Sequence, residues 1–215
     1  MTITDSYGRI AIIGAGDLGR QIAHMALQSN YNIVGFFDDF FNQSVVLNGI
    51  SLLGRIDEII SRQDEYDSIV IAIGYKHFAV RASLYQFLKE HHIPLATIIH
   101  HTAYIDDTAC IGEGSVISAN VTIDKNCVVG NNVFINISST IAHDSTIGDH
   151  SFLAPCVAVA GVTQIGRCSF IGINATIINR LRLPDNIVVG AGAVVTNNLN
   201  GTGTYVGIPA RKIKD

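Results

Sequence analysis

The chain has few charged residues and no long apolar segment. Only 15 % of its 215 residues are charged, and the net charge is −4, whereas general nucleic-acid-binding proteins usually carry a basic patch. No apolar run approaches the roughly 18 residues of a membrane span. The first residues, Met1 to Asp5, lack the basic and apolar regions of a signal peptide. We therefore expect a cytoplasmic protein that binds neither nucleic acid nor membrane.

Cysteine is also scarce, and its spacing matches no metal or redox motif. The four cysteines show no CxxC spacing and all fall in the second half of the chain: Cys110, Cys127, Cys156 and Cys168. This favours reduced thiols over a disulfide or a zinc site. The histidine pairs at 91–92 and 100–101 indicate a helix end and a domain junction. Since neither pair has metal-ligand spacing, we expect no metal.

The second half repeats with a period of six. From Ile105 to Val195, every sixth residue is Ile, Leu or Val, for sixteen consecutive steps. A period of six fits neither an α-helix nor an ordinary strand, and it is typical of a β-helix with a continuous apolar interior. Four glycines spaced by eighteen indicate three hexads per coil: Gly112, Gly130, Gly148 and Gly166.

The fourth position of a hexad, counted from its aliphatic residue, is repeatedly Asn or Gly. These residues tolerate a left-handed backbone, as a tight corner requires. They are Gly114, Asn120, Asn126, Asn132, Asn174, Asn186, Gly192 and Asn198. The third and fourth positions are therefore predicted to lie at corners, where side chains project outward. We expect the strand stack to end near Asn200, before a tail that runs to Arg211.

The first half alternates strands and helices. Predicted strands cover 9–13, 33–37, 68–73 and 95–99, and predicted helices end near 28 and cover about 56–62 and 78–91. Such βαβ units indicate a parallel sheet covered by helices, so the chain divides into a Rossmann-like α/β domain at 1–100 and an all-β helix at 101–215. Ligands of such sheets bind beyond the carboxyl ends of the strands. Those ends carry the Gly14 loop, Asp38-Asp39 and Gly74-Tyr75.

The Gly14-x-Gly16-x-x-Gly19 loop, with Asp38 about twenty residues on, matches a dinucleotide-binding fingerprint. About 100 residues supply only half of a usual dinucleotide sheet, which favours one nucleotide with its phosphate near the helix start. Asp38 and Asp39 could bind the base or ribose, or form a solvated strand end. Gly74-Tyr75 could face a ligand or form only a tight loop.

These motifs together carry a family resemblance. Residues 105–200 resemble the hexapeptide-repeat acyltransferases, and Gly207-Ile208-Pro209-Ala210-Arg211 is similar to that family's closing segment. Gly14-Ala15-Gly16, Phe37-Asp38-Asp39 and Ala72-Ile73-Gly74 occur in the order seen in bacterial nucleotide-sugar acetyltransferases. The whole chain thus resembles the bacillosamine and perosamine N-acetyltransferases, a group whose layout the sialic acid O-acetyltransferases share.

The resemblance implies a left-handed parallel β-helix, a homotrimer, and acetyl-CoA as co-substrate. It implies substrate binding by Gly14, Gly16, Asp17, Asp38, Asp39, Gly74 and Tyr75, and acetyl-CoA binding by Asn136, Gly161, Ile173 and Ala191. The chain departs from the family pattern at Asp17-Leu18, at Asp144 and at Phe152. Asp17-Leu18 follows the glycine turn where the group commonly has His, and Phe152 stands where a second histidine would lie near the thioester.

The resemblance also identifies His143 as the catalytic base, followed by Asp144 where the group typically has Glu. Imidazole titrates near neutrality and suits acyl transfer to an amine, while an adjacent carboxylate can fix its tautomer. A solvated corner histidine is the alternative for His143. His150, beside Asp149, is the second candidate base.

The leading prediction is an acetyl-CoA-dependent N-acetyltransferase that acts on the 4-amino group of a nucleotide-linked amino-deoxysugar, for surface polysaccharide synthesis. Sugar O-acetylation, sialic acid included, is an alternative on the same fold, as is another acyl donor such as formyl or succinyl. A non-catalytic β-helix binding protein is the alternative from a different class. The sequence does not choose among UDP, dTDP and GDP carriers.

Overall fold

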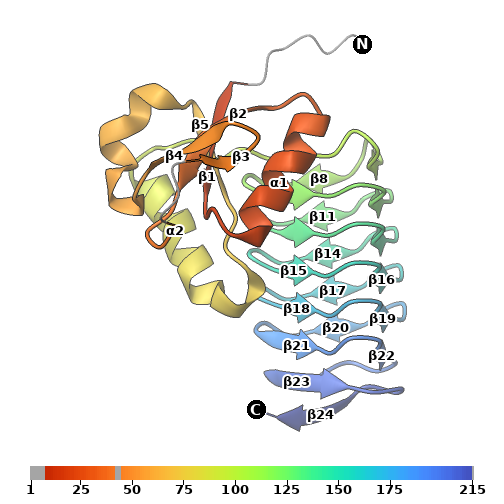
Figure 1. Ribbon diagram of the computed structural model, residues 1–215. Coiled ribbons are helices and arrows are strands. Elements are labelled where there is room, and N and C mark those ends of the chain that lie inside the picture. Colours follow the sequence, from red (N-terminus) through yellow and green to blue (C-terminus); the bar gives the residue numbers. More distant parts are fainter. Residues whose placement is uncertain (1–7, 42–44, 215) are drawn as a thin grey trace. The chain divides into compact units, whose positions relative to one another are not determined.

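The computed structural model describes residues 8–41 and 45–214, and its chain forms two compact units, Met1–His100 and His101–Asp215 (Figure 1). The expectation about Met1 to Asp5 lies outside the described residues. Within the described ranges, the helices are too short or too polar to cross a membrane. Each unit has its own core. The first is formed by alternating strands and helices, and the second by the six-residue repeat.

The first unit is an α/β domain with a five-stranded sheet in the order β3-β4-β2-β1-β5. Neighbouring strands are parallel except for the antiparallel pair β3–β4. Its strands are β1 (Arg9–Ile13), β2 (Asn32–Phe37), β3 (Val45–Leu47), β4 (Ile50–Gly54) and β5 (Ser68–Ile71); its α-helices are α1 (Asp17–Gln28) and α2 (Phe78–Glu90). The strand β6 (Ile98–Ile99) follows α2.

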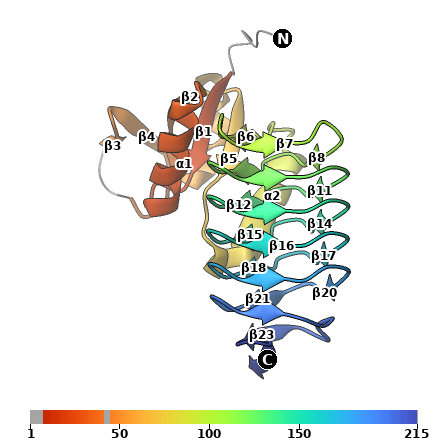
Figure 2. The same ribbon diagram turned by 90° about the vertical axis from the view of Figure 1, so that its right-hand side faces the viewer.

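Strand alternation gives the sheet of the first unit two apolar faces. Ala11 and Ile13 of β1 belong to one core cluster with Leu88 of α2, whereas α1 buries its own apolar stripe, which includes Ile22 and Ala26. Figures 1 and 2 show α1 and α2 on opposite faces of this sheet. The predicted Rossmann-like arrangement of a parallel sheet between helices is therefore confirmed.

Two local predictions in the first unit were wrong in detail, and one hairpin was missed. The helix predicted over 56–62 is two 3₁₀ turns, η1 (Ile56–Glu58) and η2 (Ile60–Glu65), and Arg62 at φ −112° forms a kink inside the second. The strand expected at 95–99 is reduced to β6 and a single bridge between Leu95 and Ile69. The hairpin β3–β4 was not predicted, since no residue of β4 is fully buried and the strand gives no clear apolar pattern.

The second unit is a left-handed parallel β-helix with three faces. Strands of one face lie eighteen residues apart, as the pairs Ile123↔Ile141 and Val129↔Ile147 show, so each coil is three hexads long as predicted. Figure 1 shows these short strands stacked one below another from green to blue. The last residue of each two-residue strand points into the core, where Ile123 and Ile141 are fully buried.

The three faces have these strands. The first comprises β7 (Tyr104–Ile105), β10 (Thr122–Ile123), β13 (Thr140–Ile141), β16 (Ala158–Val159), β19 (Thr176–Ile177) and β22 (Val194–Val195). The second comprises β8 (Cys110–Ile111), β11 (Val128–Val129), β14 (Thr146–Ile147), β17 (Gln164–Ile165) and β20 (Arg182–Leu183). The third includes β9 (Val116–Ile117), β12 (Phe134–Ile135), β15 (Phe152–Leu153), β18 (Phe170–Ile171), β21 (Ile187–Val189), β23 (Gly203–Val206) and β24 (Arg211–Lys214).

Most corners of the coil share one backbone conformation. From Gly114 to Gly192, each fourth hexad position has a positive φ, including positions that are neither Asn nor Gly: Ser138, Asp144, His150, Cys156, Val162, Cys168 and Arg180. The stacked coils impose this conformation, since each such amide from Asn120 onward bonds to the preceding coil, as Val162 N does to His143 O at 2.9 Å. The prediction failed at Asn198, which lacks the positive φ and instead accepts a hydrogen bond from Arg182 N.

The strand stack continues beyond Asn200, contrary to prediction. β23 pairs in parallel with β21, and β24 then turns back to pair antiparallel with β23. The tail predicted to follow the stack therefore forms its last layer. All four cysteines carry free thiols, and they range from the buried Cys127 to the exposed Cys110 and Cys156.

Candidate active site

His143 and Asp144 form a hydrogen-bonded pair at a corner of the β-helix. They are the third and fourth residues of their hexad, between β13 and β14, and Asp144 has the left-handed φ of 59°. His143 Nδ1 lies 2.8 Å from Asp144 Oδ2. Both side chains are nearly half exposed, at 46 % and 44 %, so the ring is open to a ligand. The contact predicted between the carboxylate of Asp144 and the ring of His143 is thus present in the structure.

The second carboxylate oxygen of Asp144 is also engaged. Asn126 Nδ2 donates to Asp144 Oδ1 over 3.0 Å. Hydrogen bonds from His143 and then from Asn126 hold the pKa of Asp144 below its ordinary value, and Lys125 lowers it further through its charge. An ionised Asp144 accepts from Nδ1–H, which assigns the tautomer in which His143 Nε2 carries the lone pair.

Gly161 provides the surface against which the imidazole lies. A Cβ added at Gly161 would come within 2.6 Å of His143 Nε2 and 2.7 Å of Cε1. The next amide, Val162 N, donates to the carbonyl oxygen of His143 at 2.9 Å. A side chain at position 161 would therefore displace the ring.

The second candidate base lies in a different environment. His150 has a left-handed φ of 62° and is only 5 % exposed, and its Nδ1 lies 3.1 Å from Asn132 Nδ2. The neighbouring carboxylate of Asp149 accepts from the backbone amide of Asn131 at 2.8 Å. Because ring and carboxylate are both engaged by residues of the preceding coil, the geometry favours His143 over His150.

Phe152, at the position of the family's second histidine, belongs to an aromatic stack. Its ring centroid lies 4.7 Å from that of Phe134 and 6.0 Å from that of Phe170, one coil away on either side. The side chain is 7 % exposed. This position contributes packing between coils and offers no proton donor.

The predicted acetyl-CoA residues lie along the two edges of one face. Ile173 and Ala191 are exposed at the corner where coils pass from the third face to the first, whereas Gly161 lies at the opposite edge, beside His143. Asn136 is buried near the former corner, and its Oδ1 accepts from Ile137 N. A hollow of about 450 Å³ lies on the face between these edges; it is lined by Thr140, Ala142, Ala158, Val159, Ala160, Thr176, Ile177, Ile178 and Asn179.

In the first unit, the glycine loop is shaped by packing. Gly14 has a φ of +104°, and a Cβ there would come within 2.9 Å of Ala72 O; a Cβ at Gly19 would collide with Gly14 O. Gly16 caps the N-terminus of α1 with open space around it. Asp17 follows with a fully exposed side chain that pairs with Arg20. Backbone packing within the domain therefore accounts for Gly14 and Gly19, whereas Gly16 has no such packing constraint.

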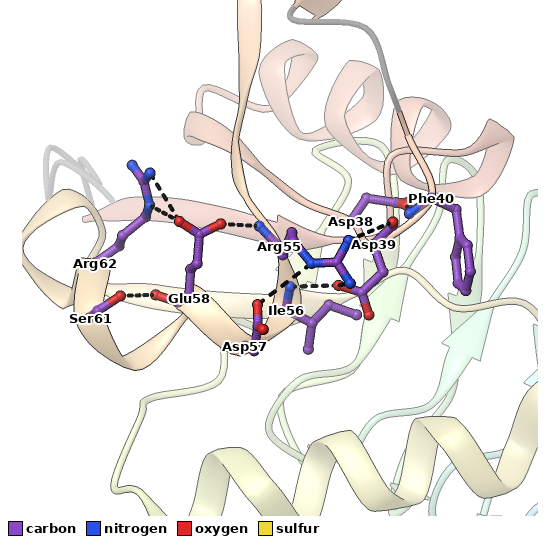
Figure 3. Close-up of polar contacts among 9 residues, drawn as sticks. All are labelled: Asp38, Asp39, Phe40, Arg55, Ile56, Asp57, Glu58, Ser61 and Arg62. Carbon is purple, nitrogen blue, oxygen red and sulfur yellow. Dashed lines mark hydrogen bonds and ion pairs between the residues drawn. The ribbon is translucent and has the colours of Figure 1, made fainter.

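The two aspartates at the end of β2 differ in role. Asp38 Oδ2 accepts from Ala15 N at 2.7 Å, while Oδ1 accepts from Phe40 N at 2.8 Å and Phe41 N at 2.9 Å. Asp38 therefore ties the glycine loop to the strand end. Asp39 Oδ1 accepts from Ile56 N at 3.0 Å, and the Arg55 guanidinium lies 3.7 Å from the same oxygen (Figure 3).

Asp39 and Arg55 border a cavity of about 550 Å³ within the first unit. Its other lining residues are Ile56, Asp57, Ala79, Val80, Ser83, Leu84 and Phe87. Arg55 also lies 3.8 Å from Asp57, so one cation faces two carboxylates at the rim (Figure 3). Sequence reasoning missed Arg55 because it follows the unpredicted strand β4. Gly74 and Tyr75 begin the turn η3 (Tyr75–His77) and do not line this cavity.

Potential metal ligands are dispersed over the two units. In the part of the chain that the structure describes, no three His, Cys, Asp or Glu residues cluster so as to hold a metal ion. The groups available for chemistry are the His143–Asp144 pair in the second unit and the charged rim of the cavity in the first.

Comparison with known proteins gives a family match for each unit. Residues 9–88 match the PglD N-terminal domain, and residues 99–215, more than half of the chain, match the GMPPB C-terminal domain. The acetyltransferase domain of PglB from Neisseria gonorrhoeae FA1090 is 27 % identical, with a TM-score of 0.88 over 95 % of this chain and 99 % of that one. The chain belongs to the hexapeptide-repeat nucleotide-sugar N-acetyltransferases. It is therefore an acyltransferase.

Two further solved structures are similar over nearly the whole chain. WeeI from Acinetobacter baumannii AYE is 28 % identical, with a TM-score of 0.84, over 95 % of this chain and 99 % of that one. The GDP-perosamine N-acetyltransferase of Caulobacter crescentus is 25 % identical, with a TM-score of 0.90, over 97 % and 98 %. That enzyme was crystallised with CoA and GDP-perosamine as a histidine-to-alanine and as a histidine-to-asparagine variant.

Proposed function

We propose that this acyltransferase moves an acetyl group from acetyl-CoA to the 4-amino group of a nucleotide-linked amino-deoxysugar. The observation that carries the proposal is the His143–Asp144 pair, with a 2.8 Å hydrogen bond at an exposed corner and a glycine behind the ring. The similar perosamine enzyme, with CoA and GDP-perosamine bound, supports the class of both substrates.

In the proposed mechanism, His143 moves one proton in two steps. Nε2 accepts a proton from the sugar amine as its nitrogen attacks the thioester carbonyl carbon, and Asp144 stabilises the resulting imidazolium through Nδ1–H. The C–S bond then breaks, and Nε2–H returns the proton to the departing CoA sulfur. The nitrogen attacks directly, so no acyl group is attached to the protein.

The two units divide the substrates between them in this proposal. The first unit, 1–100, binds the nucleotide at the cavity edged by Asp39 and Arg55, with Gly16, Asp17, Gly74 and Tyr75 as further candidate contacts. The second unit, 101–215, binds acetyl-CoA along the hollow between the corners of Gly161 and Ile173, with Asn136 and Ala191 beside it. The carboxylates at the nucleotide cavity suit hydroxyl or N–H donors of ribose and base.

We also propose a homotrimer that works in the cytoplasm and supplies surface polysaccharide synthesis. Residues 105–200 carry only eleven charged side chains, while Val128, Ile137 and Ile173 leave apolar surface exposed. Such surface favours burial against further copies of the chain. Sedimentation equilibrium at micromolar concentration should give three times the mass of one chain, and a monomer would contradict this part of the proposal.

The direct test of function is a thiol-release assay with acetyl-CoA against a panel of UDP-, dTDP- and GDP-linked sugars. Each amino sugar is paired with its hydroxy analogue. Release with amino sugars alone supports N-acetylation, while release with the hydroxy analogues would identify an O-acetyltransferase. Binding of both substrates without thiol release would leave a binding protein. Substituting formyl- or succinyl-CoA identifies the donor.

A further inference from the structure

We infer that Asn126 is a positioning residue for the catalytic base and acts through Asp144. The inference rests on the proposed role of His143. Asn126 Nδ2 donates to Asp144 Oδ1 at 3.0 Å, and Asp144 Oδ2 accepts from His143 Nδ1 at 2.8 Å. The three side chains form a continuous series of hydrogen bonds, with the reacting nitrogen at one end and Asn126 at the other.

The coil geometry explains why Asn126 reaches Asp144. The two residues occupy the same hexad position in successive coils, eighteen residues apart, and both have a left-handed φ, 56° and 59°. Adjacent strands of a sheet lie about 4.8 Å apart, so side chains that leave a corner in the same direction can meet. Asn126 is fixed from the preceding coil as well, because its backbone amide donates to Thr108 Oγ1 at 2.8 Å.

An amide at position 126 suits Asp144 better than a carboxylate would. The χ2 torsion of an aspartate has a broad distribution, so a carboxylate held through one oxygen can still rotate. Hydrogen bonds to both oxygens fix the plane of the carboxylate. The Asn126 amide supplies the second bond without adding a charge. The charged groups around Asp144 are then His143, when protonated, and Lys125. Aspartate at 126 would set two carboxylates against each other beside the imidazole.

Two substitutions separate these effects while keeping the corner. Asn126→Gly retains the left-handed backbone and removes the amide, and Asn126→Asp retains the shape but removes the donor. Asn120 is the matched control, because it lies at the same hexad position with the same φ of 56° and outside the series that ends at His143. Asn120→Gly and Asn120→Asp should leave kcat and both KM values unchanged.

For Asn126→Gly we expect kcat to fall about three- to tenfold, with the KM values for acetyl-CoA and the sugar nucleotide unchanged. For Asn126→Asp we expect a larger fall, and the rise of kcat/KM with pH should move to higher pH. The added negative charge stabilises the imidazolium, so the ring loses its proton later. A wild-type kcat and pH profile in both variants would overturn the inference, as would equal losses in the Asn120 variants.

Nitrogen NMR of the His143 ring tests the same point without turnover, with the signal assigned by its loss in His143→Ala. Wild type should show mainly the Nδ1–H tautomer, and Asn126→Gly should show a smaller share of it. An unchanged tautomer ratio would contradict the inference. If the ratio changes while wild type releases no thiol with any sugar nucleotide, the proposed function fails and the positioning role stands.

Discussion

The imidazole of His143 lies against Gly161, eighteen residues further along the chain and one coil away. The space between ring and backbone is too small for a methyl group, since an added Cβ would come within 2.6 Å of Nε2. The backbone on both sides is fixed by the bond from Val162 N to His143 O. The repeat that builds the β-helix thus also supplies the surface that orients the proposed base.

Gly161→Ala should therefore lower kcat strongly. The added methyl group must push the ring away from its hydrogen bond with Asp144, and we expect a loss of at least about 10²-fold, comparable to the loss of a general base. Steady-state kinetics measures the effect, and circular dichroism and acetyl-CoA binding check that the coil is intact. A kcat within threefold of wild type would show that the ring does not need this position.

Much of the second unit could be predicted from the sequence. A single aliphatic residue in each hexad determines which side of the strand faces the core. The aliphatic residue at each sixth position gave the coil length and the core. Corner residues such as Cys156 and Val162 could not be predicted from their own preferences, since the stacked backbone overrides them. The extension to β23 and β24 was missed because the hexad pattern ends before it.

Val162 tests this override. A β-branched residue at φ 61° is strained by roughly 1–2 kcal/mol, and its side chain is 40 % exposed, so little packing is lost on substitution. Val162→Asn should raise the free energy of unfolding by about 1 kcal/mol, seen as a Tm increase of about 2–4 °C. Ile173→Asn is the control, because Ile173 is also exposed but lacks a positive φ. An equal increase in both variants would contradict the assignment of strain.

The two aspartates of the first unit should separate stability from binding. Asp38→Ala leaves three backbone N–H groups without their acceptor and should lower the free energy of unfolding by about 1–3 kcal/mol. Asp39→Asn keeps an acceptor for Ile56 N and removes the charge at the cavity. It should raise the KM for the sugar nucleotide severalfold, with stability and the KM for acetyl-CoA unchanged. Equal losses for both substrates would contradict the assignment of this cavity.

The sequence indicated both aspartates but could not distinguish them. They are adjacent, and their roles depend on which backbone amides lie nearby: Ala15 for Asp38 and Ile56 for Asp39. The partner Arg55 comes from a strand that no pattern predicted. The His143–Asp144 pair was easier to identify because its members are neighbours in the chain, whereas Asn126 requires the coil register.

Asp144→Asn should cost less activity than His143→Ala, because an amide can still accept from the ring but cannot stabilise imidazolium. Since the pKa of Asp144 lies below its ordinary value, the carboxylate is ionised at neutral pH. The acid limb of kcat/KM should therefore follow a single ionisation. In Asp144→Asn it should move to lower pH, because the protonated ring loses its counter-charge. A limb that moved to higher pH would contradict this electrostatic role.

The central claim is that His143 is the base, and the His143→Ala variant tests it most directly. A positioned base contributes about 10²–10⁴-fold, so kcat/KM for the sugar nucleotide should fall by two to four orders of magnitude while the Kd for acetyl-CoA stays nearly unchanged. His150→Ala, measured alongside, should retain catalysis if it folds. A His143→Ala enzyme within about threefold of wild type, with turnover abolished in His150→Ala, would contradict the account.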